Sequence, residues 1–320
     1  MQIPMLRSTP LCRALIVCCS FFGCLLLGGA QARQFALGQS ESLVLKESTE
    51  VVNVTVTVTN ADQRAIAGLL PQQFELYEDK VKQQVEYFRQ EDAPISAGIV
   101  FDVSGSMLGK IKRAGLALEA FVRASRKDDE FFLLGFNDSP ILLARSTDGK
   151  TMLNRIGLLN AYGQTALYDA VNAGLSELRR SRHRKRVLLI ISDGEDNASR
   201  QTFYDMRQRL REENVLVYCI GISEIKETAG ATFDKRGKAI LNNIARLTGS
   251  SAFYPRTAME LDEAMVQIAL ELRRQYNLGY SPTNPRRDGK WRKIQVRVNA
   301  PEERVRLTVR SREGYYAPKN

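Results

Sequence analysis

Histidine and cysteine, two side chains common in zinc sites and in nucleophilic catalysis, are scarce in this sequence. Its 320 residues include one histidine, His183, and five cysteines, of which four lie within the first 24 positions. A single histidine excludes a three-histidine zinc site, a His-Glu-x-x-His zinc site and a Ser-His-Asp triad. A Gly-rich phosphate loop of the Walker type is also missing. We therefore predict that the protein is not an enzyme.

Long apolar runs are scarce as well. The longest extends from Ala14 to Leu27, follows two arginines and precedes Ala30-Gln31-Ala32. This order is typical of a secretory signal peptide, predicted over residues 1–32 with cleavage near Ala32. The run is shorter than the roughly 20 residues that a membrane-spanning helix needs. Lipid attachment at Cys24 is an alternative that the bulky residues before it disfavour. We expect a secreted, periplasmic or cell-envelope protein with no transmembrane helix in the mature chain.

Removal of the signal would leave one cysteine, Cys219, in the strand-like segment VLVYCIG. One cysteine cannot form an internal disulfide, so we expect a buried small hydrophobic residue there. The mature chain must then be stabilised by its apolar core, and about 290 residues are enough for one or two domains.

Hydrophobic periodicity divides the chain into β-rich flanks and an alternating middle. In VVNVTVTVTN, valines alternate with polar residues, as in a half-buried strand, and FELYEDKVKQQVEYF predicts a hairpin turning near Asp79-Lys80. Alternation returns over Ile294–Val298 and Val305–Val309, on either side of a turn at Asn299-Ala300-Pro301. Between these flanks, apolar strands alternate with amphipathic helices, which predicts an α/β fold with a doubly wound, mostly parallel sheet. The predicted helices cover residues 110–124, 152–160, 166–181, 201–213, 238–247 and 259–276.

Three oxygen-bearing side chains follow the predicted strand at 97–101. Asp102, Ser104 and Ser106 alternate in the segment DVSGSM. Ligands of open α/β sheets bind outside the carboxyl ends of the strands, where these residues would lie. A carboxylate and two hydroxyls suit Mg²⁺, Mn²⁺ or Ca²⁺ better than zinc or copper. The alternative interpretation is a serine-rich turn that caps the next helix.

Two further polar residues occupy similar positions. Thr165 precedes a helical pattern, and Asp193 follows the apolar run 187–191. Taken separately, Thr165 could be a helix N-cap and Asp193-Gly194 a turn.

Taken together, the five residues resemble the metal-ion-dependent adhesion site of the von Willebrand factor type A domain, which is Asp-x-Ser-x-Ser followed by a distant Thr and a distant Asp. By this resemblance Ser104 and Ser106 bind the ion through their hydroxyls, and Thr165 binds directly or through water. Asp102 and Asp193 bind partly through water. The resemblance implies Mg²⁺, with Mn²⁺ or Ca²⁺ as alternatives. Because Mg²⁺ takes about six oxygen ligands, one position stays open for an Asp or Glu of a partner protein.

A wider resemblance covers most of the mature chain. The segments EDAPISAGIVFDVSGSM, QYNLGYSPTN, DGKWRKIQVRV and REGYYAP are similar to secreted bacterial proteins described as VWFA-related. Neither β-rich flank has enough strands to form a sandwich alone. We therefore predict a β-sandwich built from residues 33–93 and 277–320, with a type A domain at 94–276 inserted between them.

The net charge is +10, and basic residues are densest in RRSRHRKR. A polyanion could contact Arg179, Arg180, Arg182, Arg184, Lys185 and Arg186. A solvated connection between a helix and a strand explains the run more simply, and it would lie opposite the metal end, so we expect no nucleic acid partner. The predicted function is an exported, metal-dependent protein-binding or adhesion module. The alternatives are a non-catalytic structural subunit of a cell-envelope complex and, less favoured, a polyanion binder.

Overall fold

The computed structural model describes residues 51–319 except 224, 227–229, 232 and 300–305. The predicted signal peptide, Cys24, the turn residues Ala300 and Pro301, and Val305 lie outside the described residues. The chain from Glu47 onward forms one compact unit.

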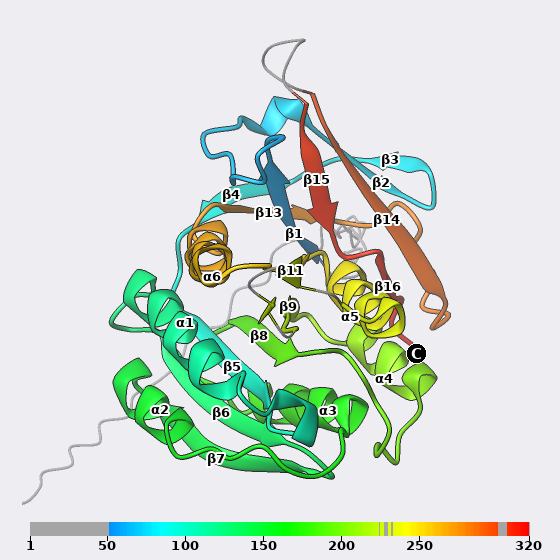
Figure 1. The fold of residues 1–320 in the computed structure, drawn as a ribbon. Coiled ribbons are helices and arrows are strands. Elements are labelled where there is room, and N and C mark those ends of the chain that lie inside the picture. Colours follow the sequence, from blue (N-terminus) through cyan, green and yellow to red (C-terminus); the bar gives the residue numbers. More distant parts are fainter. Residues whose placement is uncertain (1–50, 224, 227–229, 232, 300–305, 320) are drawn as a thin grey trace, which may run out of the picture. The chain divides into compact units, whose positions relative to one another are not determined.

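A six-stranded sheet forms the centre of the middle region, with the strand order β12-β9-β8-β5-β6-β7 (Figure 1). Its strands are β5 (Ile95–Asp102), β6 (Glu130–Phe136), β7 (Pro140–Thr147), β8 (Lys185–Ser192), β9 (Leu216–Gly221) and β12 (Ala252–Phe253). Neighbouring strands run parallel except β7, which is antiparallel to β6. The predicted α/β fold with a mostly parallel sheet is confirmed.

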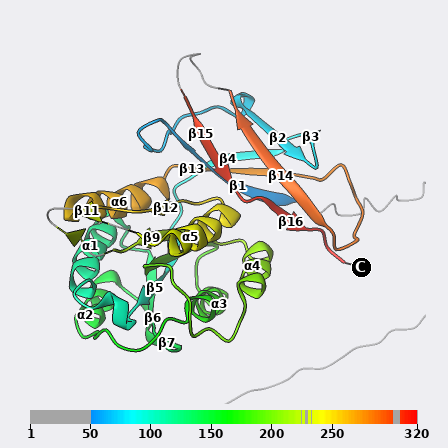
Figure 2. The same ribbon diagram turned by 45° about the vertical axis from the view of Figure 1, so that its right-hand side comes forward.

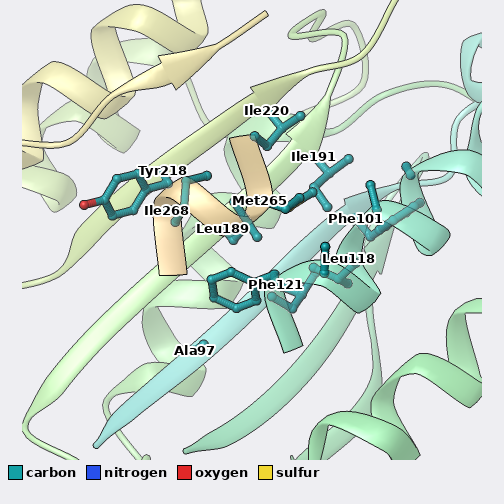
Figure 3. Close-up of a cluster of buried hydrophobic side chains, with 14 of the residues drawn as sticks. Ala97, Phe101, Leu118, Phe121, Leu189, Ile191, Tyr218, Ile220, Met265 and Ile268 are labelled. Atoms are coloured by element: carbon teal, nitrogen blue, oxygen red, sulfur yellow. The ribbon is translucent and has the colours of Figure 1, made fainter. Parts of the chain in front are cut away.

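Helices cover both faces of this sheet. They are α1 (Ile111–Ala124), α2 (Gly149–Ile156), α3 (Leu167–Leu178), α4 (Phe203–Glu212), α5 (Lys235–Thr248) and α6 (Ala258–Glu271). Strand residues alternate between the two faces, so Phe101 and Ile191 pack with α1, α2 and α6, whereas Val100 and Ile190 pack with α3, α4 and α5. Figure 3 shows the first of these clusters, in which Phe121 and Ile268 approach the sheet from two helices. Cys219 is fully buried in the second, as predicted.

Helix α6 ends earlier than its pattern predicts. The sequence predicts helix as far as Tyr276, but the last helical residue is Glu271. Residues Gln275–Tyr280 instead form strand β13, whose residues pair with strands on both sides. Hydrogen bonds to two neighbouring strands outweigh local helical periodicity here. The predicted boundary between residues 276 and 277 therefore falls inside a strand.

The two flanks form two more four-stranded sheets, with the orders β15-β1-β13-β4 and β16-β14-β2-β3. Their strands are β1 (Val52–Thr59), β2 (Phe74–Glu78), β3 (Val81–Gln83), β4 (Tyr87–Glu91), β13, β14 (Trp291–Val298), β15 (Thr308–Ser311) and β16 (Gly314–Tyr316). Both sheets mix strands from before and after the middle region, and their apolar side chains form one cluster. The predicted hairpin joins β2 to β3, with Asp79 and Lys80 at the positive φ angles of 45° and 71° that such a turn requires.

Strand β1 is buried on both faces over its second half. Thr57 is 1% and Thr59 is 0% exposed, so the predicted half-buried strand is wrong there. The reason is that β1 and β13 lie next to helices α5 and α6, as both ribbon views show (Figures 1 and 2). In α1, Leu116 is apolar and would be expected on the buried face of the helix predicted over 110–124, but it is 57% exposed. Of the helices in the described part of the chain, none has the length and apolarity to cross a membrane.

Candidate metal-binding site

Asp102 is the last residue of β5 and lies at the carboxyl edge of the central sheet. Its side chain is fully buried. One carboxylate oxygen accepts a hydrogen bond from the Ser104 amide at 2.9 Å, and the other accepts one from the Ser192 hydroxyl at 2.6 Å. These two bonds fix the orientation of the carboxylate.

Ser104 and Ser106 lie in the turn after β5. Residues Gly105–Met107 form a short 3-10 helix, and buried Met107 anchors it to the core. The two serine hydroxyl oxygens are 3.1 Å apart. Ser104 occupies the N-cap position but makes no side-chain capping bond, so its hydroxyl is not used to cap this helix.

The loop before α3 is attached to the same turn. The Gly105 amide donates to the Gly163 carbonyl at 3.0 Å, and the Tyr162 amide donates to Val103 at 2.9 Å. Thr165, two residues further on, is 3% exposed. Its amide donates to the Asn197 side chain at 2.8 Å, and its carbonyl accepts from the Asn197 amide at 2.9 Å. Since Ala166 is the N-cap of α3, Thr165 is not the capping residue.

Asp193 follows β8 and is connected to Asp102 through Ser192. The Ser192 hydroxyl donates to Asp102 and accepts from the Gly194 amide at 3.0 Å. Gly194 has a φ of +88°, and a Cβ there would lie 2.5 Å from the Gly237 carbonyl oxygen, so only glycine fits this backbone. The Lys110 ammonium lies 4.0 Å from the Asp193 carboxylate.

The electrostatic environment of Asp102 is unusual for a carboxylate. Its pKa is raised to about 6, mainly by burial and to a lesser extent by the nearby Asp193 charge, and the hydrogen bonds from Ser104 and Ser192 oppose this change. Among the described residues, no basic side chain lies within ion-pair distance of Asp102. Burying an unpaired carboxylate is costly, and a divalent cation at this position would offset the cost.

The available donors fit a hard cation. Within the described residues, no three His, Cys, Asp or Glu side chains come together as a metal site. A cation here would therefore depend on serine and threonine hydroxyls beside the two carboxylates. The donors Asp102, Ser104, Ser106, Thr165 and Asp193 are all oxygen atoms, as Mg²⁺, Mn²⁺ and Ca²⁺ prefer.

Sequence patterns missed three residues that organise these loops. Ser192 links the loops that carry Asp102 and Asp193, Asn197 holds Thr165, and Lys110 approaches Asp193. Each is a common residue type at a strand end, in a loop or at a helix start, and spacing alone gives no signal for it. For Ser192, the one signal in the sequence is that it directly precedes Asp193.

Two acidic residues near Asp193 have other roles. Asp196 accepts hydrogen bonds from the Tyr168 amide at 3.2 Å and from the Ser199 hydroxyl at 2.6 Å, so it holds the first turn of α3. Burial raises its pKa. Glu195 is exposed, and its amide donates to Asp193 at 3.4 Å.

The basic run lies between α3 and β8, at the opposite end of the sheet. Several of its members have acidic partners: Arg179 contacts Glu213 at 2.6 Å and Arg180 contacts Glu177 at 3.8 Å. Arg182 donates its amide to Glu130 at 2.7 Å. The remaining basic residues, Arg184, Lys185 and Arg186, lie at the start of β8 and line a cavity at that end of the sheet.

Residues 98–195, from β5 through Asp193, match the model of the von Willebrand factor type A domain. The chain contains a von Willebrand factor type A domain. The matched segment includes all five predicted ligands, and their roles as ligands stay a prediction. No curated protein sequence matches the chain.

Several solved structures of low sequence identity resemble parts of this chain. A von Willebrand factor type A protein from Catenulispora acidiphila is 11% identical over 84% of this chain and 75% of its own, with a TM-score of 0.46. An aerotolerance-related membrane protein from Bacteroides fragilis is 15% identical, covers 55% of this chain and 98% of its own, and has a TM-score of 0.45. Proximal thread matrix protein 1 of the mussel byssus, in a form with a zinc-occupied MIDAS motif, is 19% identical with a TM-score of 0.47. That match covers 61% of this chain and 49% of the mussel protein.

Proposed function

We propose that the protein is an exported, non-catalytic, divalent-metal-dependent protein-binding module. The ion, Mg²⁺ or a similar hard cation, is held by Asp102, Ser104, Ser106, Thr165 and Asp193. An Asp or Glu side chain of a partner protein takes the open coordination position. We also infer that the two four-stranded sheets form a β-sandwich into which the type A domain is inserted.

The burial of Asp102 is the observation that carries this proposal. A fully buried carboxylate with a raised pKa and two neighbouring hydroxyls is an expensive arrangement unless a cation compensates it. Its hydrogen bonds hold it in a fixed position. Such rigidity favours binding of an ion, because few degrees of freedom are lost when the ion arrives.

The surface beside the site suits a protein partner. Leu108 follows the serine turn and is 77% exposed, and Tyr162 in the adjoining loop is 59% exposed. The hydrogen bonds between Gly105 and Gly163 and between Tyr162 and Val103 keep these two loops together. Large apolar side chains next to a charged contact are typical of protein interfaces, where aromatic residues are enriched.

The absence of catalysis remains part of the proposal. Asp196, an acidic residue near Asp193, uses one carboxylate oxygen to accept hydrogen bonds from the Tyr168 amide of α3 and from the Ser199 hydroxyl. The one histidine lies in the basic run at the other end of the sheet. Neither group supports activation of a water near Asp102.

Calorimetric titration with Mg²⁺ and Mn²⁺ tests the proposal directly. We expect affinities between about micromolar and millimolar, typical of sites with few charged ligands. The double variant Ser104→Ala, Ser106→Ala removes two hydroxyl ligands and should lose the binding while keeping its circular dichroism spectrum. Ser199→Ala serves as a control, because this serine bonds Asp196 outside the ligand set and should leave metal affinity nearly unchanged.

Partner binding is then measured with the metal-loaded protein immobilised. Acidic partners should be retained with Mg²⁺ and released by a chelator, and the double variant should not retain them. If the native protein shows no heat with either ion, the metal-dependent mechanism is wrong. The type A domain would then serve as an assembly scaffold, as in a structural subunit of an envelope complex.

A further inference from the structure

A basic cavity lies at the amino end of the central sheet, away from the metal-binding end. Its volume is about 450 Å³, within the range of small-molecule sites. The walls come from the starts of β8 and β9, the end of α4 and the strands β1, β4 and β13. The basic residues that line it are Arg89, Arg184, Lys185, Arg186, Arg211 and Arg312.

Negative charge in this cavity is low. Glu213 is the acidic residue in the lining, and its carboxylate is bound by Arg179 at 2.6 Å. Arg179 is 55% exposed at its side chain and belongs to the outer part of the basic run. The charge of Glu213 is therefore already compensated from outside, and the cavity keeps a strong positive potential.

Arg312 supports the same conclusion independently. Burial lowers the pKa of its guanidinium, because desolvation disfavours the charged form. In the described part of the chain, its charged group makes no ion pair with a carboxylate and instead lies 5.6 Å from the centre of the Tyr315 ring. A desolvated cation without a counterion costs stability unless a ligand supplies the missing charge.

Arg211 is oriented by an aromatic ring. Its guanidinium lies 5.0 Å from the centre of the Trp291 ring. Stacking of this kind fixes the plane of a guanidinium and leaves its edge for hydrogen bonds. Arg211 and Arg312 both line this cavity and also a second one beside it.

We propose that this cavity binds a small polyvalent phosphate-type anion, either a free polyphosphate or a phosphate ester. Guanidinium groups donate pairs of parallel hydrogen bonds that match the oxygens of a phosphate group. The volume admits more than one phosphate group, so several cations act together. The amides of Asn53 and Asn214, also in the lining, supply neutral donors and acceptors for the rest of an ester.

The proposal divides the basic run into two parts with different roles. Arg179, Arg180 and Arg182 contact acidic side chains or carbonyl groups of the protein itself. Arg184 and Arg186 line the cavity, and so does Lys185, whose ammonium also donates to the Leu272 carbonyl. The anion site is independent of the metal site, because β8 begins at one and ends at the other.

Calorimetric titration of the intact chain with inorganic phosphate and with tripolyphosphate tests this site. All buffers contain a chelator, so that phosphate bound through a metal at Asp102 is eliminated. We expect tripolyphosphate to bind at least about tenfold more tightly than phosphate, because each additional negative charge can contact another basic side chain of the cavity. Glycerol phosphate in a third titration distinguishes an ester from a free anion.

Two variants locate the binding. Arg184→Gln removes an exposed cation of the cavity, and Arg312→Met removes a half-buried one. Each should weaken tripolyphosphate binding by about tenfold, a loss of about 1.4 kcal/mol. Arg180→Gln makes the same charge change outside the cavity and should change affinity less than twofold.

Thermal unfolding without anion provides a second measurement. Because Arg312 is a desolvated cation without a carboxylate partner, Arg312→Met should keep or raise the melting temperature. A purely structural arginine would instead lower it. The proposal would be overturned if neither anion gave binding heat in the titrations. It would also be overturned if Arg180→Gln lost as much affinity as the cavity variants, because that result indicates general electrostatic attraction.

Discussion

Lys110 places a positive charge inside the candidate metal site. Its ammonium lies 4.0 Å from Asp193, and both side chains are less than a fifth exposed. In the absence of a cation this contact compensates Asp193, but a bound divalent ion would be repelled by Lys110. In the proposed site, a metal ion would therefore compete with an ion pair within the chain.

Replacement of Lys110 by methionine should strengthen metal binding. The change keeps the length of the side chain and removes the competing charge, so we expect Mg²⁺ affinity to rise by about three- to tenfold, or about 1 kcal/mol after solvent screening. Calorimetric titration measures this directly. Lys112→Met is the matched control, since Lys112 is exposed on the same helix and makes the same change in net charge. Equal affinities for Lys110→Met and the native protein would contradict the competition.

For single residues, the sequence predicted where the candidate ligands lie in the fold better than it predicted which side chains contact them. Asp102, Ser104 and Asp193 lie at strand ends, as the apolar runs before them indicate, because the end of a buried strand is visible in hydrophobicity. Ser192 and Lys110 could not be predicted, because their roles depend on contacts between loops that are far apart in the sequence.

Helix α6 and strand β15 are joined by a buried ion pair. The Arg310 guanidinium donates to the Glu271 carboxylate at 2.6 Å, and the Tyr218 hydroxyl donates to the other oxygen of the same carboxylate at 2.5 Å. The Glu271 side chain is 0% exposed and that of Arg310 14%. Gln275 extends this network from Tyr218 to Thr57 in β1. These polar contacts connect the type A domain to the sheet of β15 and β1.

Breaking this pair from one side should be costly. Arg310→Met leaves the Glu271 carboxylate buried with Tyr218 as its remaining donor, and we expect a loss of about 3 kcal/mol in the free energy of unfolding. Urea denaturation measures it. Arg123→Met removes the exposed pair with Glu119 and should cost less than about 0.5 kcal/mol. A small effect of Arg310→Met would mean that water reaches Glu271.

Helices and strands were predicted well where a single hydrophobic periodicity extends over many residues. Helix α5, predicted over 238–247, ends at Thr248, and Gly249 with a φ of +82° is its C-cap. The end of α6 was wrong because the apolar residues of β13 continue a pattern compatible with a helix. Pairing of β13 with β1 and β4 involves residues more than 180 positions away, and local periodicity contains no information about it.

At the scale of the whole molecule, the contacts between the type A domain and the flanking sheets predict cooperative unfolding. We expect scanning calorimetry to give one transition, because Glu271, Gln275 and β13 belong to both parts. Mg²⁺ at about 100 times its dissociation constant adds about 2.7 kcal/mol, which should raise the melting temperature by about 5–10 °C. The Ser104→Ala, Ser106→Ala variant should show no such shift. Two transitions, of which one responds to Mg²⁺, would contradict this coupling.

The pairing of strands β4 and β13 determines how the molecule responds to a mechanical force. The type A domain is entered directly from β4 and left directly into β13, and the two strands pair with each other, with Gln275 opposite Glu91. A force applied to the type A domain is therefore transmitted to two adjacent strands at the same end of one ladder. Along the strand direction, β13 slides against β1 only if all their hydrogen bonds from Val52 to Val56 break together. The junction between the type A domain and the flanking strands is therefore arranged to resist shear.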